Sequence, residues 1–171
     1  SKLASLGALV LGKTGNTTAI TVNSNATLDG ALTIYGPVTL AGNITSGGVQ
    51  TYNGDVTISA VSVALSTMGG GATGSAITFN GDIEGASANA NSLFLLSGAG
   101  AITVTGGVGV TKALSYLGLG GSGLVSTSQT WLYDRAWSDG YSFTAPEAGT
   151  YQLALWGASG GDYSTDDGSI S

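Results

Sequence analysis

Apolar and polar residues alternate along most of this chain in short segments that end at glycine or asparagine. Typical segments are Ala8-Leu9-Val10-Leu11, Val38-Thr39-Leu40, Val56-Thr57-Ile58 and Ala101-Ile102-Thr103-Val104. Alternation with a period of two that stops at turn-forming residues predicts short β-strands. The same pattern predicts strands at 19–22, 26–28, 31–35, 43–45, 61–65, 76–79 and 93–96. No window keeps apolar residues at helical spacing over three turns without a glycine, so we predict an all-β fold.

One pentapeptide recurs and sets the period of the strands. Tyr52-Asn53-Gly54-Asp55-Val56 returns 27 residues later as Phe79-Asn80-Gly81-Asp82-Ile83. A sequence motif that recurs every 20–30 residues or so is typical of a solenoid, in which each repeat forms one coil. Strands of neighbouring coils would pair at about 4.8 Å, and inward Val, Ile, Leu and aromatic side chains would form a continuous core. Residues 7–125 would then make roughly five or six coils.

The two Asn-Gly-Asp steps are expected at corners between strands. Glycine there would supply a positive φ, and the side chains of Asp55 and Asp82 would cap backbone N–H groups. Tyr52 and Phe79, one residue before each step, are expected to stack in the core. Because the repeat length varies, we expect loops of differing size to leave one corner. A β-sandwich with Greek-key connections is the alternative architecture, since it also uses short strands.

The composition changes from about Ser128 onward. Eight of the thirteen aromatic residues follow this point, and they include all three tryptophans. The run Tyr151 to Trp156 alternates as a strand that ends at Gly157. We therefore predict two parts: a β-solenoid over 1–126, and an aromatic-rich, short antiparallel β module over 127–171. Aromatic faces stack on sugars, so candidate ligand-binding residues in the second part are Trp131, Trp137 and Trp156.

Charge and cysteine content limit the partners of the chain. Only 8% of the residues are charged, about a third of the usual share. The net charge is −6 and only four residues are basic, too few to neutralise a run of phosphates, so nucleic-acid binding is excluded. The chain contains no cysteine and no histidine, and nothing indicates a cofactor. The longest apolar run near the start, 3–11, is too short to span a bilayer, so we predict no transmembrane segment.

Several local motifs match functional patterns without the context that their chemistry needs. Residues 7–14 fit the phosphate-loop pattern but are followed by a predicted strand and not by a helix, which favours a strand and a surface turn. Gly69, Gly71 and Gly74 fit a dinucleotide fingerprint without a βαβ unit, which favours a loop. Gly157 to Gly161 fits the nucleophile-elbow pattern, yet a chain without histidine cannot build the usual triad.

Acidic residues are the remaining candidates for chemistry. Asp55 and Asp82 stand at equivalent repeat positions, and a carboxylate pair roughly 5–10 Å apart can cleave glycosides. The pattern favours turn caps over this acid–base role, because one acid per repeat comes without Arg or Lys to hold sugar acids. Asp162, Asp166 and Asp167 are candidate calcium ligands, although their spacing misses the EF-hand loop and a solvated acidic tail also explains them.

The middle of the chain resembles the repeat regions of filamentous-haemagglutinin-like bacterial exoproteins. The residues that carry the resemblance are 48–58 and 76–83, continued by 91–93 and 100–106. The resemblance covers about two thirds of the chain, and its specificity lies in the succession of the motifs. It implies a right-handed parallel β-helix, export from the cell, and a structural or adhesive stalk. It supplies no catalytic residues.

The end of the chain is similar to the start of a glycine-rich module of receptor-kinase ectodomains and bacterial surface proteins. The matching residues are 141–146, 149–153 and 156–161. That module normally continues into long glycine-rich segments, whereas this sequence stops at Ser171.

Together these features predict a non-enzymatic structural or adhesive segment, located outside the cell or on a bacterial surface. Its expected partners are other copies of itself, through end-to-end or lateral assembly, or a glycan or protein of a host or cell surface. A carbohydrate-binding module that uses the Trp- and Tyr-rich end is the second hypothesis, and a polysaccharide lyase or hydrolase is the third. Threonine-rich strands also occur in ice-binding solenoids, but only Thr103-Val104-Thr105 has the required Thr-x-Thr form.

Overall fold

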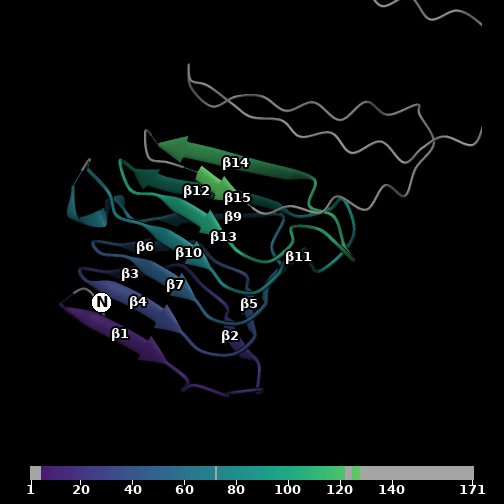
Figure 1. The fold of residues 1–171 in the computed structure, drawn as a ribbon, viewed down its shortest axis with the longest axis horizontal. Coiled ribbons are helices and arrows are strands. Elements are labelled where there is room, and N and C mark those ends of the chain that lie inside the picture. Colours follow the sequence, from purple (N-terminus) through teal and green to yellow (C-terminus); the bar gives the residue numbers. More distant parts are fainter. Residues whose placement is uncertain (1–4, 72, 122–124, 128–171) are drawn as a thin grey trace, which may run out of the picture.

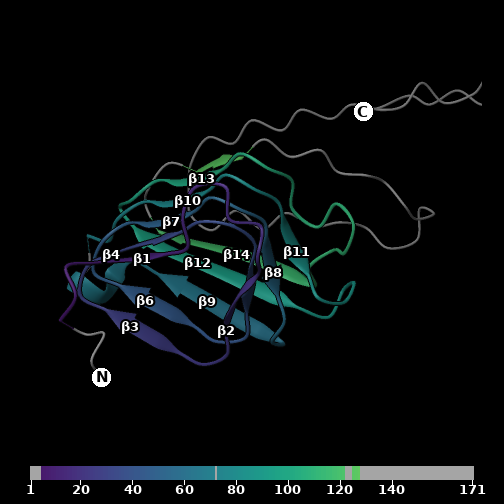
Figure 2. The same ribbon diagram turned by 90° about the horizontal axis from the view of Figure 1, so that it is seen from below.

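The computed structural model describes residues 5–71, 73–121 and 125–127, and in this part the chain is all-β. Its strands form three parallel sheets, which surround one interior (Figures 1 and 2). From Ala8 to Gly98 successive strands go to each sheet in turn, so that the chain passes from sheet A to sheet B to sheet C and back. The described strands after Gly98 lie in sheets A and C. This winding is the solenoid-like arrangement that the repeated pentapeptide predicts.

Sheet A has six strands, in the order β1-β4-β7-β10-β13-β15. Their bounds are β1 Ala8–Leu11, β4 Ala31–Ile34, β7 Gln50–Tyr52, β10 Ile77–Phe79, β13 Ile102–Val104 and β15 Val125–Thr127. The pairing of sheet A reaches Thr127.

Sheets B and C form the other two sides of the coils. Sheet B contains β2 Ile20–Val22, β5 Val38–Leu40, β8 Val56–Ile58 and β11 Ile83–Gly85. Sheet C contains β3 Ala26–Leu28, β6 Ile44–Ser46, β9 Ser62–Ser66, β12 Ser92–Gly98 and β14 Tyr116–Gly121. One 3₁₀ turn, η1 Met68–Gly70, follows β9. Figure 1 shows the strands stacked as rungs, from β1 at one end to β14 and β15 at the other.

Most strands have only three residues, and their burial alternates as buried, half-buried, buried. The first and third side chains point into the interior, and the middle one points outward, as the pleat requires. The strand register places inward residues of one coil over inward residues of the next: Ile34 pairs with Tyr52, and Tyr52 pairs with Phe79. The inward residues form one hydrophobic core that continues from Leu28 to Val108.

The strand predictions made from alternation are largely confirmed. The structure agrees within a residue or two at each strand that was predicted. The strands β7, β11, β14 and β15 were not predicted. In β7, the inward position that precedes Tyr52 is the polar Gln50, which breaks the apolar alternation.

The prediction that extra residues leave one corner is wrong. Long connections occur at all three corners: 12–19 between β1 and β2, 67–76 between β9 and β10, and 86–91 between β11 and β12. Because each sheet only requires the in-register strands to be present, an insertion at any corner leaves the core ladder intact.

Candidate functional surfaces

The Asn-Gly-Asp corners form a ladder of side chains between the sheets A and B. The Asp55 Oδ1 atom accepts a hydrogen bond from the backbone N–H of Asp82 at 3.0 Å, and the Asp82 Oδ1 atom accepts one from the Gly107 N–H at 2.7 Å. The Asn80 side-chain amide donates to the Asn53 Oδ1 atom at 2.8 Å, across 27 residues of sequence. The predicted role of Asp55 and Asp82 as corner caps is therefore confirmed, with each acid capping the next coil.

The glycine of each corner is needed for a different reason from the one predicted. Neither Gly54 nor Gly81 has a positive φ, although Gly36, at the equivalent corner of the preceding coil, has φ +92°. A Cβ on Gly54 would lie 2.3 Å from the Gly36 carbonyl carbon, and one on Gly81 would lie 2.6 Å from the Asp55 Oδ1 atom. The coils touch backbone to backbone at this corner, so the space excludes a side chain.

The core contains a stacked aromatic pair and a polar network beside it. The Tyr52 and Phe79 rings lie 4.9 Å apart between centroids with their planes at 9°, which confirms the predicted stack. The Tyr52 hydroxyl donates to the Gln50 Oε1 atom at 2.8 Å, and the Gln50 Nε2 atom donates to the Ser46 Oγ atom at 3.0 Å and to the Ser66 carbonyl at 2.8 Å. All three of Gln50, Tyr52 and Ser46 are fully buried. Burial raises the pKa of the Tyr52 hydroxyl, because the phenolate would lose its hydration.

The outer faces of sheets A and B are ladders of threonine. On sheet A the outward Val10 of β1 is followed in register by Thr33, Thr51, Thr78 and Thr103. On sheet B they are Thr21, Thr39 and Thr57, followed by Glu84. Because each three-residue strand has one outward position, each face has a single threonine column along these strands. An ice-binding face of the Thr-x-Thr type needs two columns, and these strands supply only one.

Glu84 connects the last coil of sheet B to the loop that follows β13. Its Oε1 atom accepts from the Thr111 N–H at 3.0 Å, and its Oε2 atom accepts from the Lys112 N–H at 2.7 Å. Ile83 forms a parallel bridge with Val108, which continues sheet B past its last strand. This carboxylate thus anchors a loop and belongs to the scaffold of the molecule.

The two motifs that resemble nucleotide-binding loops lie in strands and turns, as their context predicted. Residues 8–11 of the phosphate-loop pattern form β1, and the chain turns at Gly12 and Gly15, which have φ +75° and +79°, before entering β2. The triplet at Gly69, Gly71 and Gly74 lies in η1 and the loop after it. Thr67 closes this loop, because its Oγ1 atom donates to the Ser75 carbonyl at 2.6 Å and accepts from the Ser75 N–H at 2.9 Å.

A cavity of about 370 Å³ opens at the first coil, at the β1 end of the stack. Its walls include Leu9, Leu11 and Val22, which are half-buried, and the inward side chains Leu32 and Ile34 of the next coil. The polar residues at its mouth are Asn23, Ser24 and Asn25. This cavity is the open end of the core, where the ladder has no further coil among the described residues.

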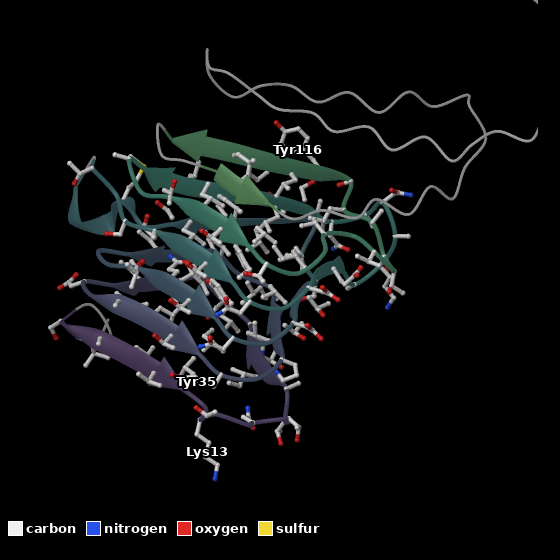
Figure 3. All side chains as sticks on the ribbon, viewed as in Figure 1. Lys13, Tyr35 and Tyr116 are labelled. Carbon is white, nitrogen blue, oxygen red and sulfur yellow. The ribbon has the colours of Figure 1, made fainter. Side chains whose placement is uncertain are left out.

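The outer face of sheet C differs from the other two faces near the β14 end. Outward residues there are Phe94, Leu96 and Tyr116, in place of the threonine of the other faces. The Phe94 and Tyr116 rings lie 5.3 Å apart between centroids with their planes at 39°. We call these three residues the aromatic patch. Figure 3 shows Tyr116 projecting from β14 at the opposite end of the molecule from Lys13.

The sequence-predicted binding residues lie outside the described residues. This applies to the candidate ligand-binding residues Trp131, Trp137 and Trp156, and to the candidate calcium ligands Asp162, Asp166 and Asp167. Within residues 5–71, 73–121 and 125–127, no three His, Cys, Asp or Glu side chains lie together in a way that could hold a metal ion. In the same part of the chain, no helix has the length and apolar character to cross a membrane.

Sequence reasoning missed the aromatic patch and the polar network around Gln50. The run Leu93-Phe94-Leu95-Leu96 contains no polar residue that would reveal which side chains face outward. One signal for the patch was present in the sequence of β14, where glycine stands at alternate positions, Gly118 and Gly120. Glycines in that pattern leave room for large side chains on a neighbouring strand. For Gln50, no signal in the sequence shows that its partners come from three different strands.

Comparison of the chain with protein-family models, with curated proteins and with solved structures finds no match.

Proposed function

We propose that this chain is a structural and adhesive segment, without enzymatic activity, of a bacterial protein that is secreted or held at the cell surface. We further propose that its three sheets wind as a right-handed parallel β-helix. The observation that supports this proposal most is the parallel pairing of six successive strands in sheet A, from β1 to β15. Each coil is stabilised by its neighbours, so the same construction produces a rod of any length. A rod of this kind serves as a stalk.

The outward residues support an adhesive role. Threonine columns on sheets A and B present hydroxyl groups at the strand spacing, about 4.8 Å, along the rod. Asn53 and Asn80 add amide groups at the corner between these sheets. Uncharged donors and acceptors in a fixed array suit hydrogen bonding to another copy of the chain, or to a glycan or protein on a host or cell surface.

The proposal predicts adhesion that depends on the folded coils. Beads coated with the folded chain are expected to adhere to an epithelial cell layer more strongly than beads coated with the same chain after denaturation. Thr51→Glu and Thr78→Glu would place two like charges on neighbouring strands of sheet A, and the matched change Thr39→Glu and Thr57→Glu would do so on sheet B. If one double variant loses adhesion and the other retains it, the sheet that carries the first double variant is the adhesive face. Folded and denatured chains that adhere equally would contradict the proposal.

The absence of enzymatic activity is tested with polysaccharides. Long incubation of the chain with a panel of neutral and acidic polysaccharides is expected to leave their length unchanged. Release of reducing ends or of unsaturated ends would overturn this part of the proposal. In that case Asp82→Asn, which keeps an oxygen to cap Gly107 but removes the carboxylate, would show whether the corner acids carry the activity.

A carbohydrate-binding module is the second candidate, because all three tryptophans lie within residues 131–156. Under this hypothesis, Trp137→Ala or Trp156→Ala abolishes binding to at least one glycan of an array. Thr39→Ser, on the outer face of sheet B, is the control and should leave that binding unchanged. Failure of the unsubstituted chain to bind any glycan would eliminate the module and leave the stalk proposal unaffected.

A further inference from the structure

The aromatic patch brings three large apolar side chains together on the outer face of sheet C. Tyr116 is 52% exposed and Leu96 is 36% exposed, while Phe94 is half-buried between them. On the other three strands of sheet C, the outward residues include Thr27, Thr45 and Ser66. The change from hydroxyl to aromatic side chains therefore occurs within one sheet, over its last two strands. Contiguous exposed apolar surface of this kind marks a contact with another polypeptide segment or ligand.

The glycines of β14 shape this surface. The register places Phe94 opposite Gly118 and Leu96 opposite Gly120. A Cβ on Gly118 would lie 2.7 Å from the Phe94 Cδ1 atom, and one on Gly120 would lie 2.7 Å from the Leu96 Cδ2 atom. Both side chains thus lean over glycine backbone that no other residue type would leave free. The result is a low, broad apolar surface with the Tyr116 ring at its margin. Next to this ring in the sheet, the Oγ atoms of Ser92 and Ser115 are hydrogen-bonded to each other at 2.8 Å.

The same chain contains a segment whose composition fits this surface. Of the thirteen aromatic residues, eight lie in 131–171, and the stretch 131–156 contains every tryptophan. The strand before this stretch, β15, ends at Thr127, just after β14 in the chain. β14, which carries Tyr116, and β15 are the last described strands of sheets C and A. The segment therefore follows in sequence directly after the coil that carries the patch, and ten extended residues span up to roughly 33–36 Å.

We propose that the aromatic-rich segment 131–156 of the same chain docks on the aromatic patch, with its tryptophans against Phe94, Leu96 and Tyr116. Covalent connection gives this contact a high effective concentration, so it forms within one molecule in preference to contact between molecules. Aromatic pairs prefer offset or edge-to-face packing, which the tilted rings of Phe94 and Tyr116 leave open to a third ring. Docking removes the apolar surface from water and joins the C-terminal part of the chain to the end of the solenoid.

Tryptophan fluorescence tests this proposal directly, because residues 1–130 contain no tryptophan and all emission comes from the segment in question. The experiment compares the full chain with the double variant Phe94→Ser and Tyr116→Ser. The expected result is a shift of the emission to longer wavelength and an increase in quenching by acrylamide. Val10→Ser is the matched control, since Val10 is 58% exposed on the outer face of sheet A at the other end of the molecule. Its emission and quenching should equal those of the unsubstituted chain.

Circular dichroism establishes that the sheets of each variant are intact. If the double variant does not fold, Tyr116→Ser alone is used, since that side chain is half exposed and its removal leaves no buried cavity. Emission that is identical in the variants and the unsubstituted chain would overturn the proposal. Emission that depends on protein concentration over the micromolar range would also overturn it, because the patch would then contact a second copy. A concentration-independent shift in the patch variants, absent from Val10→Ser, supports docking within the chain.

Discussion

At the scale of single residues, polar side chains fix positions that apolar packing leaves undetermined. Gln50 is the clearest case, because its amide joins Tyr52 of its own strand to Ser46 and Ser66 of sheet C across the core. A buried glutamine is tolerated only when its donors and acceptors are paired, and here three of its hydrogen bonds have good geometry. The network therefore fixes how sheets A and C meet at this coil.

We expect Tyr52→Phe to destabilise the fold by about 1–3 kcal/mol, because the Gln50 Oε1 atom would be buried without its donor. The unfolded chain loses the tyrosine proton above about pH 10, whereas burial raises the pKa of Tyr52 and keeps the proton in the folded chain. The free energy of unfolding of the unsubstituted chain therefore falls by roughly 1.4 kcal/mol per pH unit above pH 10 from this group. Urea unfolding at several pH values measures both effects.

The Tyr52→Phe variant has no hydroxyl proton at this position, so its free energy of unfolding lacks this pH dependence. The stability advantage of the unsubstituted chain over the variant is therefore complete below pH 10 and decreases above it. Tyr116→Phe is the control, since Tyr116 is 52% exposed and its change should stay within about 0.5 kcal/mol. A stability difference that is constant from pH 7 to above pH 10 would contradict the assigned burial of Tyr52.

At the scale of strands and corners, close contact between coils determines which residues a turn accepts. The corner between sheets A and B brings Gly54 onto Gly36 and Pro37, and Gly81 onto Gly54 and Asp55. The caps of Asp55 and Asp82 depend on this closeness, because each carboxylate must reach the N–H of the next coil. Glycine and aspartate thus act as a unit, which explains why they recur together in the repeat.

We expect Gly54→Ala to destabilise the protein by about 1–3 kcal/mol, the usual range for overpacking. Its Cβ would lie 2.3 Å from the Gly36 carbonyl carbon, and the two coils would have to separate locally. Gly7→Ala is the matched control, because no atom lies within 4 Å of the added Cβ and Gly7 does not have a positive φ. Urea midpoints at unchanged m-value give the comparison. Equal midpoints for the two variants would show that the corner has room to relax.

At the scale of the whole molecule, stability is expected to vary along the stack. Inner coils have a coil on either side, whereas the first coil faces the cavity at the β1 end of the described structure. Ile20 and Ile83 lie on the first and last strands of sheet B, in one inward ladder that runs through Val38 and Val56. Ile83 is fully buried, while Ile20 is half-buried beside the core.

We expect Ile83→Ala to lower the free energy of unfolding by about 2–5 kcal/mol, the range for a large-to-small change in a core. Ile20→Ala should lower it by less than half as much, because its side chain buries less surface and leaves no closed cavity. Thermal and urea unfolding of the two variants make the comparison with the same residue type and the same substitution. A larger effect at Ile20 would show that the first coil is as tightly packed as the interior.

The coarse architecture of this protein follows from local patterns in its amino-acid sequence. Alternation with a period of two depends only on the pleat of a strand, so Val38 to Leu40 and Val56 to Ile58 could be recognised without knowing their neighbours. The recurrence at 27 residues required equal positions to lie above one another, and the stack of Tyr52 on Phe79 and the caps of Asp55 and Asp82 follow from that requirement.

Other features depend on contacts between distant segments and emerge only from the folded chain. Phe94 and Leu96 lie in an uninterrupted apolar run, and their outward direction is set by the register with Ala64 and with the glycines of β14. The reason for Gly54 is a neighbouring coil and not its own φ. Local pattern specifies each strand, whereas the space left by adjacent coils specifies faces, corners and surfaces, and that space exists only once the chain is wound.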